Sequence, residues 1–308
     1  MPFFSIILPT YNRASFLSRT IGSVLSQNFS DFELIIIDDA STDTTKEVVD
    51  SFTDNRIRYY KNEKNIERSA SRNKGIDLSL GTYICFLDSD DAYRPNHLSS
   101  FYNFILQNDE PKGIIYTGIQ RNYKSGETEK VFEYPNGNIS IVEWILQKQL
   151  PAPSSVCIHK EILLQHNFNQ QFSLNEDIEL WVRIVASYPL YYISEITLDF
   201  YIHGGNTKFV FQDQSTELLT VFKAICRNPI CKNHISKQFQ RSRLKTLRSQ
   251  RISSVINSTD SNNIVSLILF FILRYPLAYQ NKYRLYVLLK NIPGLRFGIQ
   301  LYSKLKRT

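Results

Sequence analysis

Up to about residue 120, short apolar runs alternate with segments whose apolar residues recur at helical spacing. The expected strands are five runs rich in aliphatic and aromatic residues: Phe4–Leu8, Glu33–Ile37, Ile57–Lys61, Thr82–Leu87 and Gly113–Ile119. Helical spacing is expected over Phe16–Leu25, Thr44–Phe52 and Ser69–Leu80, and Pro95 is expected at the first turn of a fourth helix. This alternation predicts an α/β fold with a mostly parallel sheet, helices on both faces and ligands beyond the carboxyl ends of its strands.

The rhythm changes between Gly126 and Gly205, where we expect the acceptor-side half of the same domain. The expected elements are, in order, a helix over Ile141–Gln149, a turn at Pro151 and Pro153, a strand over Ser155–His159, a helix over Ile178–Ser187 and strands within Tyr191–Ile202. We therefore expect a catalytic domain over residues 1–210, with a donor-nucleotide half in 1–120 and an acceptor half in 121–210.

The net charge of +7 conceals two regions of opposite sign. From Lys223 to the end there are 17 Lys and Arg against one acid, Asp260, whereas the preceding chain carries 19 basic and 28 acidic residues. Beyond Phe209 we expect helices rich in Lys and Arg, so that residues 211–308 form a basic, helical C-terminal region. A charge asymmetry of this size indicates an anionic partner, either nucleic acid or membrane lipid, although a solvated basic face without a partner is the alternative.

The stretch Ile264–Leu273 is strongly apolar and ends at Arg274. Its ten residues are too few to span a bilayer, which needs about 20. They could lie in the interface, with nearby Lys, Arg and Tyr residues at anionic headgroups. We expect peripheral binding to an anionic membrane surface, and the alternative is a helical cap on the catalytic domain or on a second subunit. No nucleic-acid recognition motif is present, so nucleic acid is not an expected partner.

The four cysteines fall at irregular spacings, which gives little support to a disulfide framework or a zinc site. The first residues run directly into the strand that begins at Phe4, with no positively charged segment and no small-residue cleavage site. We therefore expect the protein in the cytoplasm, peripheral on the cytoplasmic face of the inner membrane.

Polar residues follow the first two expected strands. The first strand runs into Pro9, Thr10 and Tyr11 without the glycines that bring backbone against a pyrophosphate, which argues against a nicotinamide enzyme and against an NTPase. The second ends in Asp38 and Asp39. Polar residues after a strand often cap the next helix, but Asp39 is not in an obvious capping position.

The fourth expected strand carries the strongest chemical signal. It ends in Asp88-Ser89-Asp90-Asp91, three acids in four positions. Carboxylates so close raise one another's pKa unless a cation neutralises them. Oxygen ligands without a nearby His/Cys cluster suit Mg²⁺ or Mn²⁺, shared with substrate phosphates. The alternative is a capped turn before the next helix.

Four segments in this order resemble the family 2 glycosyltransferases of the GT-A fold. They are the segments Ser5–Arg13, Ile37–Asp43, Ala70–Gly75 and Phe86–Asp91. A weaker continuation runs through Asn175-Glu176-Asp177, Leu180–Arg183 and Tyr201–Thr207, and the resemblance fades after about residue 210.

The resemblance implies roles for these positions. On the donor side, Pro9 and Thr10 would border the site, Tyr11 would pack on the nucleobase, and Asp39 would bond the base edge. Arg72 would lie beside the base or diphosphate with help from Arg68, Asp88 would hold the ribose side, and Ser89 would also belong to the donor site. Asp90 of the Asp-X-Asp motif would bind Mn²⁺ or Mg²⁺ and His203 would contact the metal or diphosphate, while Asp177 would be the catalytic base with Glu176 beside it. Glu67 departs from the resemblance, because relatives often have glycine there.

The resemblance thus implies a metal-dependent, inverting glycosyltransferase. It would move a sugar from a nucleotide-diphosphate sugar, in the first instance a UDP-sugar, to a hydroxyl of a saccharide or lipid-linked saccharide in bacterial cell-surface polysaccharide biosynthesis. The base would take the acceptor proton and the metal would neutralise the leaving diphosphate. The alternatives are a nucleotide-sugar-binding module without turnover and, from the basic tail, a nucleic-acid-binding protein. Asp177 as a helix N-terminal acid and His203 as a strand histidine are the structural alternatives, and Trp144 and Trp181 are expected in the core.

Overall fold

The computed structural model describes residues 1–135, 139–204 and 215–258 of the 308-residue chain. Residues Met1–Lys245 form one compact unit, and Thr246–Thr308 form a second. The apolar stretch Ile264–Leu273 and the Lys, Arg and Tyr residues expected to flank it lie outside the described residues. The first unit extends beyond residue 210, the expected limit of the catalytic domain, because it also includes the helix α9 (Ser215–Arg227).

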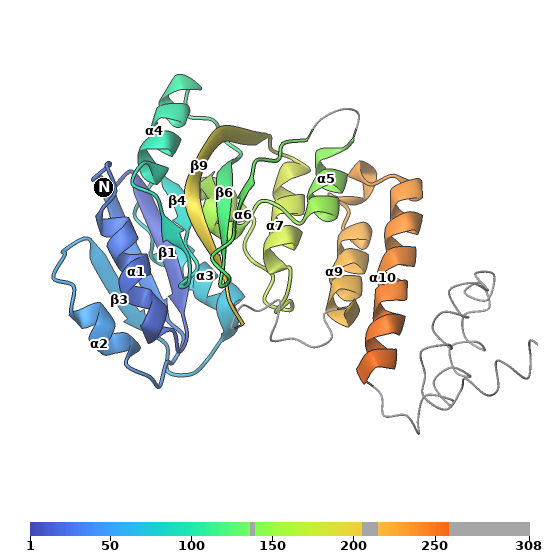
Figure 1. Cartoon of the computed structure of the whole chain (residues 1–308). Helices are drawn as coiled ribbons and strands as arrows, with labels where there is room; N and C mark the ends of the chain where they lie inside the picture. The colour runs from blue at the N-terminus through green and yellow to red at the C-terminus, as the bar shows by residue number, and fades with distance from the viewer. Residues whose placement is uncertain (136–138, 205–214, 259–308) are drawn as a thin grey trace, which may run out of the picture. The chain divides into compact units, whose positions relative to one another are not determined.

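The first half of the sheet follows the alternating pattern of the sequence (Figure 1). Its four strands are β1 (Phe4–Thr10), β2 (Phe32–Asp38), β3 (Ile57–Lys61) and β4 (Tyr83–Phe86). The helices between them are α1 (Ala14–Leu25), α2 (Thr45–Asp50) and α3 (Glu67–Leu78). The strands lie in the order β3-β2-β1-β4 and all pair in parallel. This half therefore confirms both the expected elements and their parallel arrangement.

The second half of the sheet is mixed. Its strands are β5 (Ala92–Tyr93), β6 (Ile114–Tyr123), β7 (Thr128–Val131), β8 (Val156–His159) and β9 (Leu190–Ile202). The strand β8 runs antiparallel to both β4 and β6, and β9 is parallel to β6. The antiparallel pairs of this half were not expected, because a short strand buried on both faces has the same apolar sequence in either direction. The complete order is β3-β2-β1-β4-β8-β6-β9-β5, with β7 on β6.

Helices flank this sheet, and further helices follow it in the chain. Beyond the first three they are α4 (His97–Gln107), α5 (Ile141–Lys148), α6 (Lys160–Gln165), α7 (Glu176–Val185), α9 (Ser215–Arg227) and α10 (Lys237–Ser258), with single 3₁₀ turns η1 (Pro153–Ser155) and η2 (Lys232–His234). Pro95 was expected in the first turn of α4, but it precedes the N-cap residue Asn96. The helices α9 and α10 lie within the region expected to be helical beyond Phe209, and the helical character of the rest of that region stays a prediction. No helix among residues 1–135, 139–204 and 215–258 has both the length and the apolarity to cross a membrane.

The core lies between the sheet and these helices. The β1, β2 and β4 side chains are almost all buried, and Trp181 and Trp144 are core residues, as expected, with exposures of 0% and 5%. The helix α3 approaches β1 closely, since a Cβ on Gly75 would lie 2.5 Å from Cγ2 of Ile7. This close approach places the polar residues of α3 near the carboxyl edge of the sheet.

Candidate active site

The three parallel strands β1, β2 and β4 end at one edge of the sheet. Thr10 pairs with Asp38, and the N–H of Leu87 donates to the carbonyl of Ile7. The acidic tip, defined as Asp88–Asp91, begins directly after Leu87 at this edge. The expected donor-side residues of β1, β2 and β4 are therefore brought to neighbouring positions, because parallel strands present their carboxyl ends together.

A buried serine fixes the acidic tip. The backbone N–H of Asp88 donates to Oγ of Ser154 (3.0 Å), and this hydroxyl donates to Oδ2 of Asp91 (2.7 Å). The N–H of Tyr201 donates to the other Asp91 oxygen (3.2 Å). Asp91 is 1% exposed, and burial together with Asp90 and Asp88 raises its pKa well above the ordinary value. Both carboxylate oxygens of Asp91 are thus used to anchor the tip, and Asp88 and Asp90 are the tip carboxylates that remain for the site.

Asp90 and His203, the two expected metal contacts, are adjacent. Nε2 of His203, just past β9, lies 3.0 Å from Oδ2 of Asp90, and the imidazole stacks on Phe16 with 4.6 Å between ring centroids. Arg19 donates to the Asp90 carbonyl (2.7 Å). Burial and then Asp88 raise the pKa of Asp90, while His203 and Arg13 oppose the shift. The tip therefore collects negative charge that a cation would relieve.

The donor set fits a hard divalent cation shared with a substrate. Asp90 supplies carboxylate oxygen and His203 supplies an imidazole nitrogen, and Mg²⁺ sites commonly use one or two protein carboxylates plus phosphate oxygens. Within the described part of the chain, no group of three or more His, Cys, Asp and Glu side chains is arranged to hold a metal ion. Asp90 and His203 are therefore the described side chains that would hold such an ion.

Arg72 connects the acidic tip to α7. Its Nη2 lies 2.8 Å from Oδ1 of Asp88 and its Nη1 lies 2.7 Å from Oε1 of Glu176, with the guanidinium over the ring of Phe168 at 5.2 Å. Burial alone would lower the pKa of Arg72, but the two carboxylates outweigh it and raise the pKa. Arg68 approaches the same Glu176 oxygen at 4.0 Å. The structure thus brings Arg72 and Arg68, both expected on the donor side, together at Glu176. Glu176 and Asp177 are the two residues expected to be catalytic and are called the catalytic pair below.

The two members of the catalytic pair have different surroundings. Glu176 is 3% exposed and paired with Arg72. Asp177 is partly exposed, and its Oδ1 accepts the N–H of Ile178 (2.8 Å). Burial and then Glu176 raise the pKa of Asp177 to about 7, although Arg72 opposes the shift. A partly accessible carboxylate with this pKa can accept a proton near neutral pH.

The other expected donor residues lie at the ends of β1, β2 and β4. Tyr11 is 46% exposed, as a ring available for stacking would be. Asp39 is 4% exposed, and its Oδ1 accepts hydrogen bonds from Asn62 and from the N–H of Ile66, both 2.9 Å. One Asp39 oxygen is thus committed to the loop before α3.

Three further expected donor residues support this edge through their backbone. Pro9 and Thr10 are part of β1, and the carbonyl of Thr10 accepts the N–H of Asp39 (2.8 Å). The carbonyl of Ser89 accepts the hydroxyl of Thr20 (3.0 Å). Contact of these residues with a donor remains a prediction.

Four residues with left-handed backbone surround the site. They are Asn12 after β1, Ala40 after β2, Glu67 at the start of α3 and Asn175 before α7, with φ between 51° and 70°. L-residues with side chains adopt this region at a cost, and such strain is concentrated at functional sites. At Glu67 this backbone explains why glycine would suit the position.

Several residues of the site were not expected from the sequence. Ser154, Asn62 and Arg19 contact the tip or the Asp39 loop, but their partners are between 23 and 71 residues away, which no local pattern reveals. Glu217 accepts hydrogen bonds from Ser173 and Leu174, just before α7. It has one signal in the sequence, because it is the only acid in the stretch from Ser215 to Lys245, which holds seven Lys and Arg.

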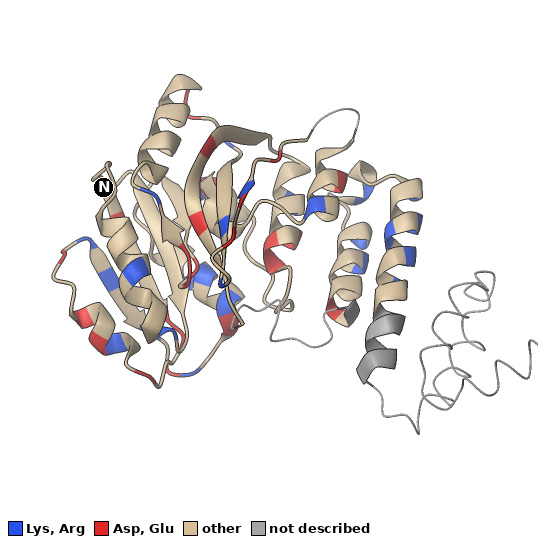
Figure 2. Ribbon diagram, in the orientation of Figure 1, with Lys and Arg blue, Asp and Glu red and all other residues tan. Residues whose placement is uncertain are grey.

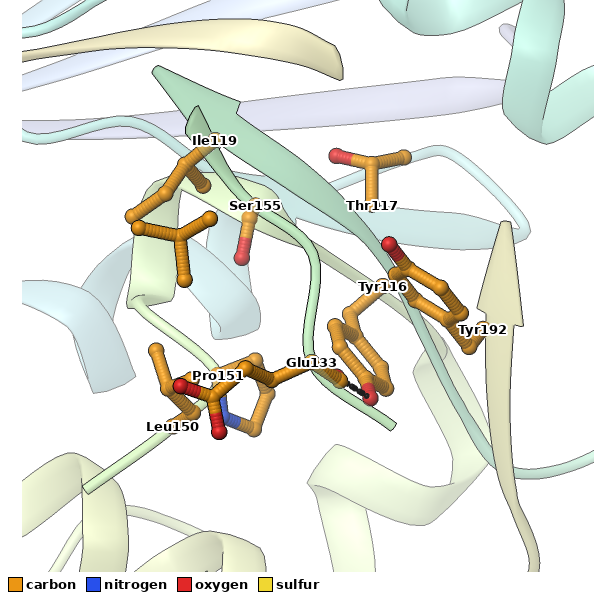
Figure 3. A pocket seen from close by; sticks show the side chains of 9 residues that line it. Tyr116, Thr117, Ile119, Glu133, Leu150, Pro151, Ser155 and Tyr192 are labelled. Carbon is orange, nitrogen blue, oxygen red and sulfur yellow. Dashed lines mark hydrogen bonds between the residues drawn. The ribbon is translucent and has the colours of Figure 1, made fainter. Parts of the chain in front are cut away.

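A pocket is lined largely by residues of the expected acceptor half of the domain (Figure 3). Its empty space is about 220 Å³, some of it open to solvent. The lining residues come mainly from β6, β9 and the turn before β8: Tyr116, Thr117, Ile119, Val131, Glu133, Leu150, Pro151, Ser155 and Tyr192. None of the expected donor or catalytic residues lines this pocket. Ser155 follows the tip-binding Ser154, so the pocket wall is continuous with the support of the tip.

A profile described as glycosyl transferase family 2 matches residues 5–166. The chain belongs to glycosyl transferase family 2. The matched segment contains the acidic tip and Arg72, while the catalytic pair and His203 follow it. The resemblance inferred from the four motifs is therefore confirmed.

Relatives of this family 2 glycosyltransferase include the GalNAc(5)-diNAcBac-PP-undecaprenol beta-1,3-glucosyltransferase of Campylobacter jejuni. It is 32% identical over 199 residues, which are 62% of this chain and 62% of the relative. The chain spans between 30% and 74% of the length of the curated relatives that it matches.

Two solved structures share the fold. Staphylococcus aureus TarS 1-349, in complex with UDP-GlcNAc, has a TM-score of 0.62 at 17% identity, covering 95% of this chain and 82% of that one. The mannosyltransferase PcManGT of Pyrobaculum calidifontis, in complex with GDP-Man and Mn²⁺, has a TM-score of 0.60 at 13% identity, covering 98% and 88%. These likenesses confirm the GT-A fold.

Proposed function

We propose that this chain is a metal-dependent, inverting glycosyltransferase that moves a sugar from a UDP-sugar to a hydroxyl of a saccharide or lipid-linked saccharide. One observation carries the proposal: Arg72 pairs with both Asp88 of the acidic tip and Glu176 of the catalytic pair. The expected metal-binding carboxylates and Asp177, a proton acceptor with a pKa of about 7, therefore belong to one site. An inverting transfer needs both groups, one for the leaving diphosphate and one for the acceptor proton.

Each residue of the site has a separate role in the proposed transfer. Asp177 accepts the proton of the acceptor hydroxyl as its oxygen bonds to the anomeric carbon, while the bond from that carbon to the diphosphate oxygen breaks and the diphosphate leaves with the electron pair. Arg68, which lies 4.0 Å from the Glu176 oxygen that Arg72 also binds, adds positive charge on the leaving-group side. Asp90 and His203 would hold Mn²⁺ or Mg²⁺. When bound, the ion supplies Lewis-acid stabilisation of the diphosphate.

The comparisons support the substrate classes. The Campylobacter relative is named for an undecaprenol-linked acceptor, TarS binds UDP-GlcNAc, and PcManGT binds GDP-Man with Mn²⁺. We infer a role in bacterial cell-surface polysaccharide assembly, with a nucleotide sugar as donor. The division of the catalytic domain into donor and acceptor halves belongs to the same proposal.

The test measures UDP release from UDP-glucose, UDP-galactose and UDP-GlcNAc, with Mn²⁺ or with excess EDTA and with water or oligosaccharides as acceptors. We expect metal-dependent release by the wild type and a loss of at least about 100-fold in Asp177→Asn, since general-base catalysis contributes that much or more. Product analysis by NMR would give the anomeric configuration. Binding of UDP-sugars without turnover by the wild type would instead indicate a non-catalytic binding module.

We also propose that α9, η2 and the first part of α10 meet an anionic membrane surface from the cytoplasmic side. Figure 2 shows Lys and Arg along α9 and α10. Six basic residues of this segment are exposed: Lys223, Arg227, Lys232, Lys237, Arg241 and Lys245. Each basic residue near an anionic surface contributes roughly 1 kcal/mol.

Vesicle sedimentation tests this surface. We expect the full chain to sediment with phosphatidylglycerol vesicles, less with phosphatidylcholine vesicles, and less after Lys223→Gln, Arg227→Gln and Lys232→Gln together. Replacing Lys46, Lys64 and Lys124 by Gln removes the same charge elsewhere and serves as the control. Equal sedimentation of both triple variants would count against the surface, and salt-sensitive binding to duplex DNA alone would favour nucleic acid.

A further inference from the structure

One carboxylate oxygen of Glu217, in the first turn of α9, accepts three hydrogen bonds from the chain just before α7. The donors are the N–H of Ser173 (2.8 Å), the hydroxyl of Ser173 (2.7 Å) and the N–H of Leu174 (2.9 Å). Asn175, Glu176 and Asp177 are the next three residues. Glu217, 40 positions after Asp177 in the chain, thus fixes the backbone that leads into the catalytic pair.

The loop between α6 and α7 is also hydrogen-bonded to α3. The 166–175 loop joins α6 to α7, and Asn73 pairs with Phe168 through two hydrogen bonds: its amide donates to the Phe168 carbonyl and its Oδ1 accepts the Phe168 N–H, both 2.9 Å. The hydroxyl of Ser69 donates to the carbonyl of Phe172 (3.3 Å). The loop is therefore held on one side by the helix that carries Arg72 and on the other by Glu217.

The position of Glu217 is set by the packing of its helix. Leu219, Val221, Phe222 and Ile225 of α9 are each no more than 4% exposed, and α9 packs against α7. An acid in a first helical turn commonly interacts with the N-terminus of its own helix. Oε1 of Glu217 instead binds two backbone N–H groups of another segment, which is how a carboxylate stabilises a loop.

We propose that Glu217 is a positioning residue for catalysis: it holds the 166–175 loop so that Asp177 reaches the acceptor hydroxyl. This inference rests on the proposed function, because it assigns the proton acceptance to Asp177. It also extends the catalytic machinery beyond residue 210, the expected limit of the catalytic domain, into the helix α9. A loop freed at Ser173 and Leu174 shifts the start of α7, and a misplacement of about 1 Å can cost about 100-fold in rate.

The test compares Glu217→Ala, Glu217→Gln and a control, Glu143→Ala. Glu143 of α5 also accepts a backbone N–H from the helical C-terminal segment, that of Ser236 (2.6 Å), but it has no bond to the 166–175 loop in the described structure. For each variant we would measure kcat and KM for Mn²⁺-dependent UDP release from the three UDP-sugars, the melting temperature and hydrogen exchange at Ser173 and Leu174.

For Glu217→Ala we expect kcat to fall by about 10-fold to 100-fold, with KM for the UDP-sugar within about twofold of wild type. Exchange at the Ser173 and Leu174 amides rises, while the melting temperature stays close to that of Glu143→Ala. Glu217→Gln restores most of kcat, because its amide oxygen accepts the same hydrogen bonds. A purely structural role would lower the melting temperature and leave the kcat of the folded fraction unchanged.

Two failures are distinguishable. If the wild type is active and Asp177→Asn is inactive, but Glu217→Ala has the same kcat as Glu143→Ala, the positioning role is wrong and the proposed function stands. If the wild type releases no UDP from any of the three sugars, the proposed function fails, and the positioning role fails with it.

Discussion

Arg72 and Glu176 form a buried ion pair: Nη1 lies 2.7 Å from Oε1, and the side chains are 3% and 4% exposed. Removing one partner of such a pair leaves the other charge buried without compensation, which costs about 3–5 kcal/mol. The pair also ties α3 to α7, so its loss would affect both the acidic tip and the catalytic pair.

Arg72→Met is therefore expected to lower the free energy of unfolding by about 3 kcal/mol. Urea unfolding measures the change. Lys46→Gln is the matched control, because its pair with Asp50 is more than half exposed on both sides and exposed pairs contribute about 0–1 kcal/mol. Similar losses in the two variants would mean that the Arg72 network contributes no more than a surface pair.

The activity should depend on pH through Asp177. Its pKa is about 7, and the proton acceptor must be ionised, so kcat/KM should rise about tenfold per pH unit below pH 7 and level off above it. A pH profile of UDP release between pH 5 and 9 checks this. A rate independent of pH across that range would exclude Asp177 as the base.

The same group should make stability depend on pH in the opposite direction. The pKa of Asp177 is about 7 in the folded state against an ordinary value of 3.8, so the folded chain holds the proton more tightly. Its contribution is complete below about pH 4 and is lost as pH rises to about 7. The stability of Asp177→Asn relative to wild type should therefore increase between about pH 4 and about pH 7 and stay constant above that in urea unfolding, although the variant loses activity.

How much of this site the sequence predicts depends on the distance between partners along the chain. The alternation of strands and helices predicts β1 to β4, and parallel pairing then predicts that Tyr11, Asp39 and the acidic tip meet at one edge. The direction of β8 and the hydrogen bond from Asp88 to Ser154, 66 residues away, depend on tertiary packing. Such partners leave no periodic signal, because the sequence around Ser154 does not distinguish it from any other serine in a Pro-rich turn.

Removal of the metal should abolish activity, and Asp90→Ala should act in the same direction. Because a metal ion stabilises the leaving diphosphate by several kcal/mol, we expect a loss of at least about 100-fold in each case. UDP release in excess EDTA, and after Mn²⁺ is added back, checks the first. Asp109→Ala removes one exposed aspartate away from the tip and should retain activity. Full activity of Asp90→Ala would contradict the assignment of the acidic tip as a metal site.

Backbone strain at the site can be tested at Ala40, whose φ is 66°. A left-handed backbone costs an L-residue about 1–2 kcal/mol, and glycine avoids this cost at an entropic loss of about 0.5–1 kcal/mol. We expect Ala40→Gly to raise the free energy of unfolding by about 0.5–1 kcal/mol, measured in urea. Ala70→Gly makes the same chemical change inside α3 and should lower it by about 1 kcal/mol. Changes of the same sign in both variants would show that the Ala40 backbone stores no strain, whereas opposite signs would locate strain in the loop that carries Asp39.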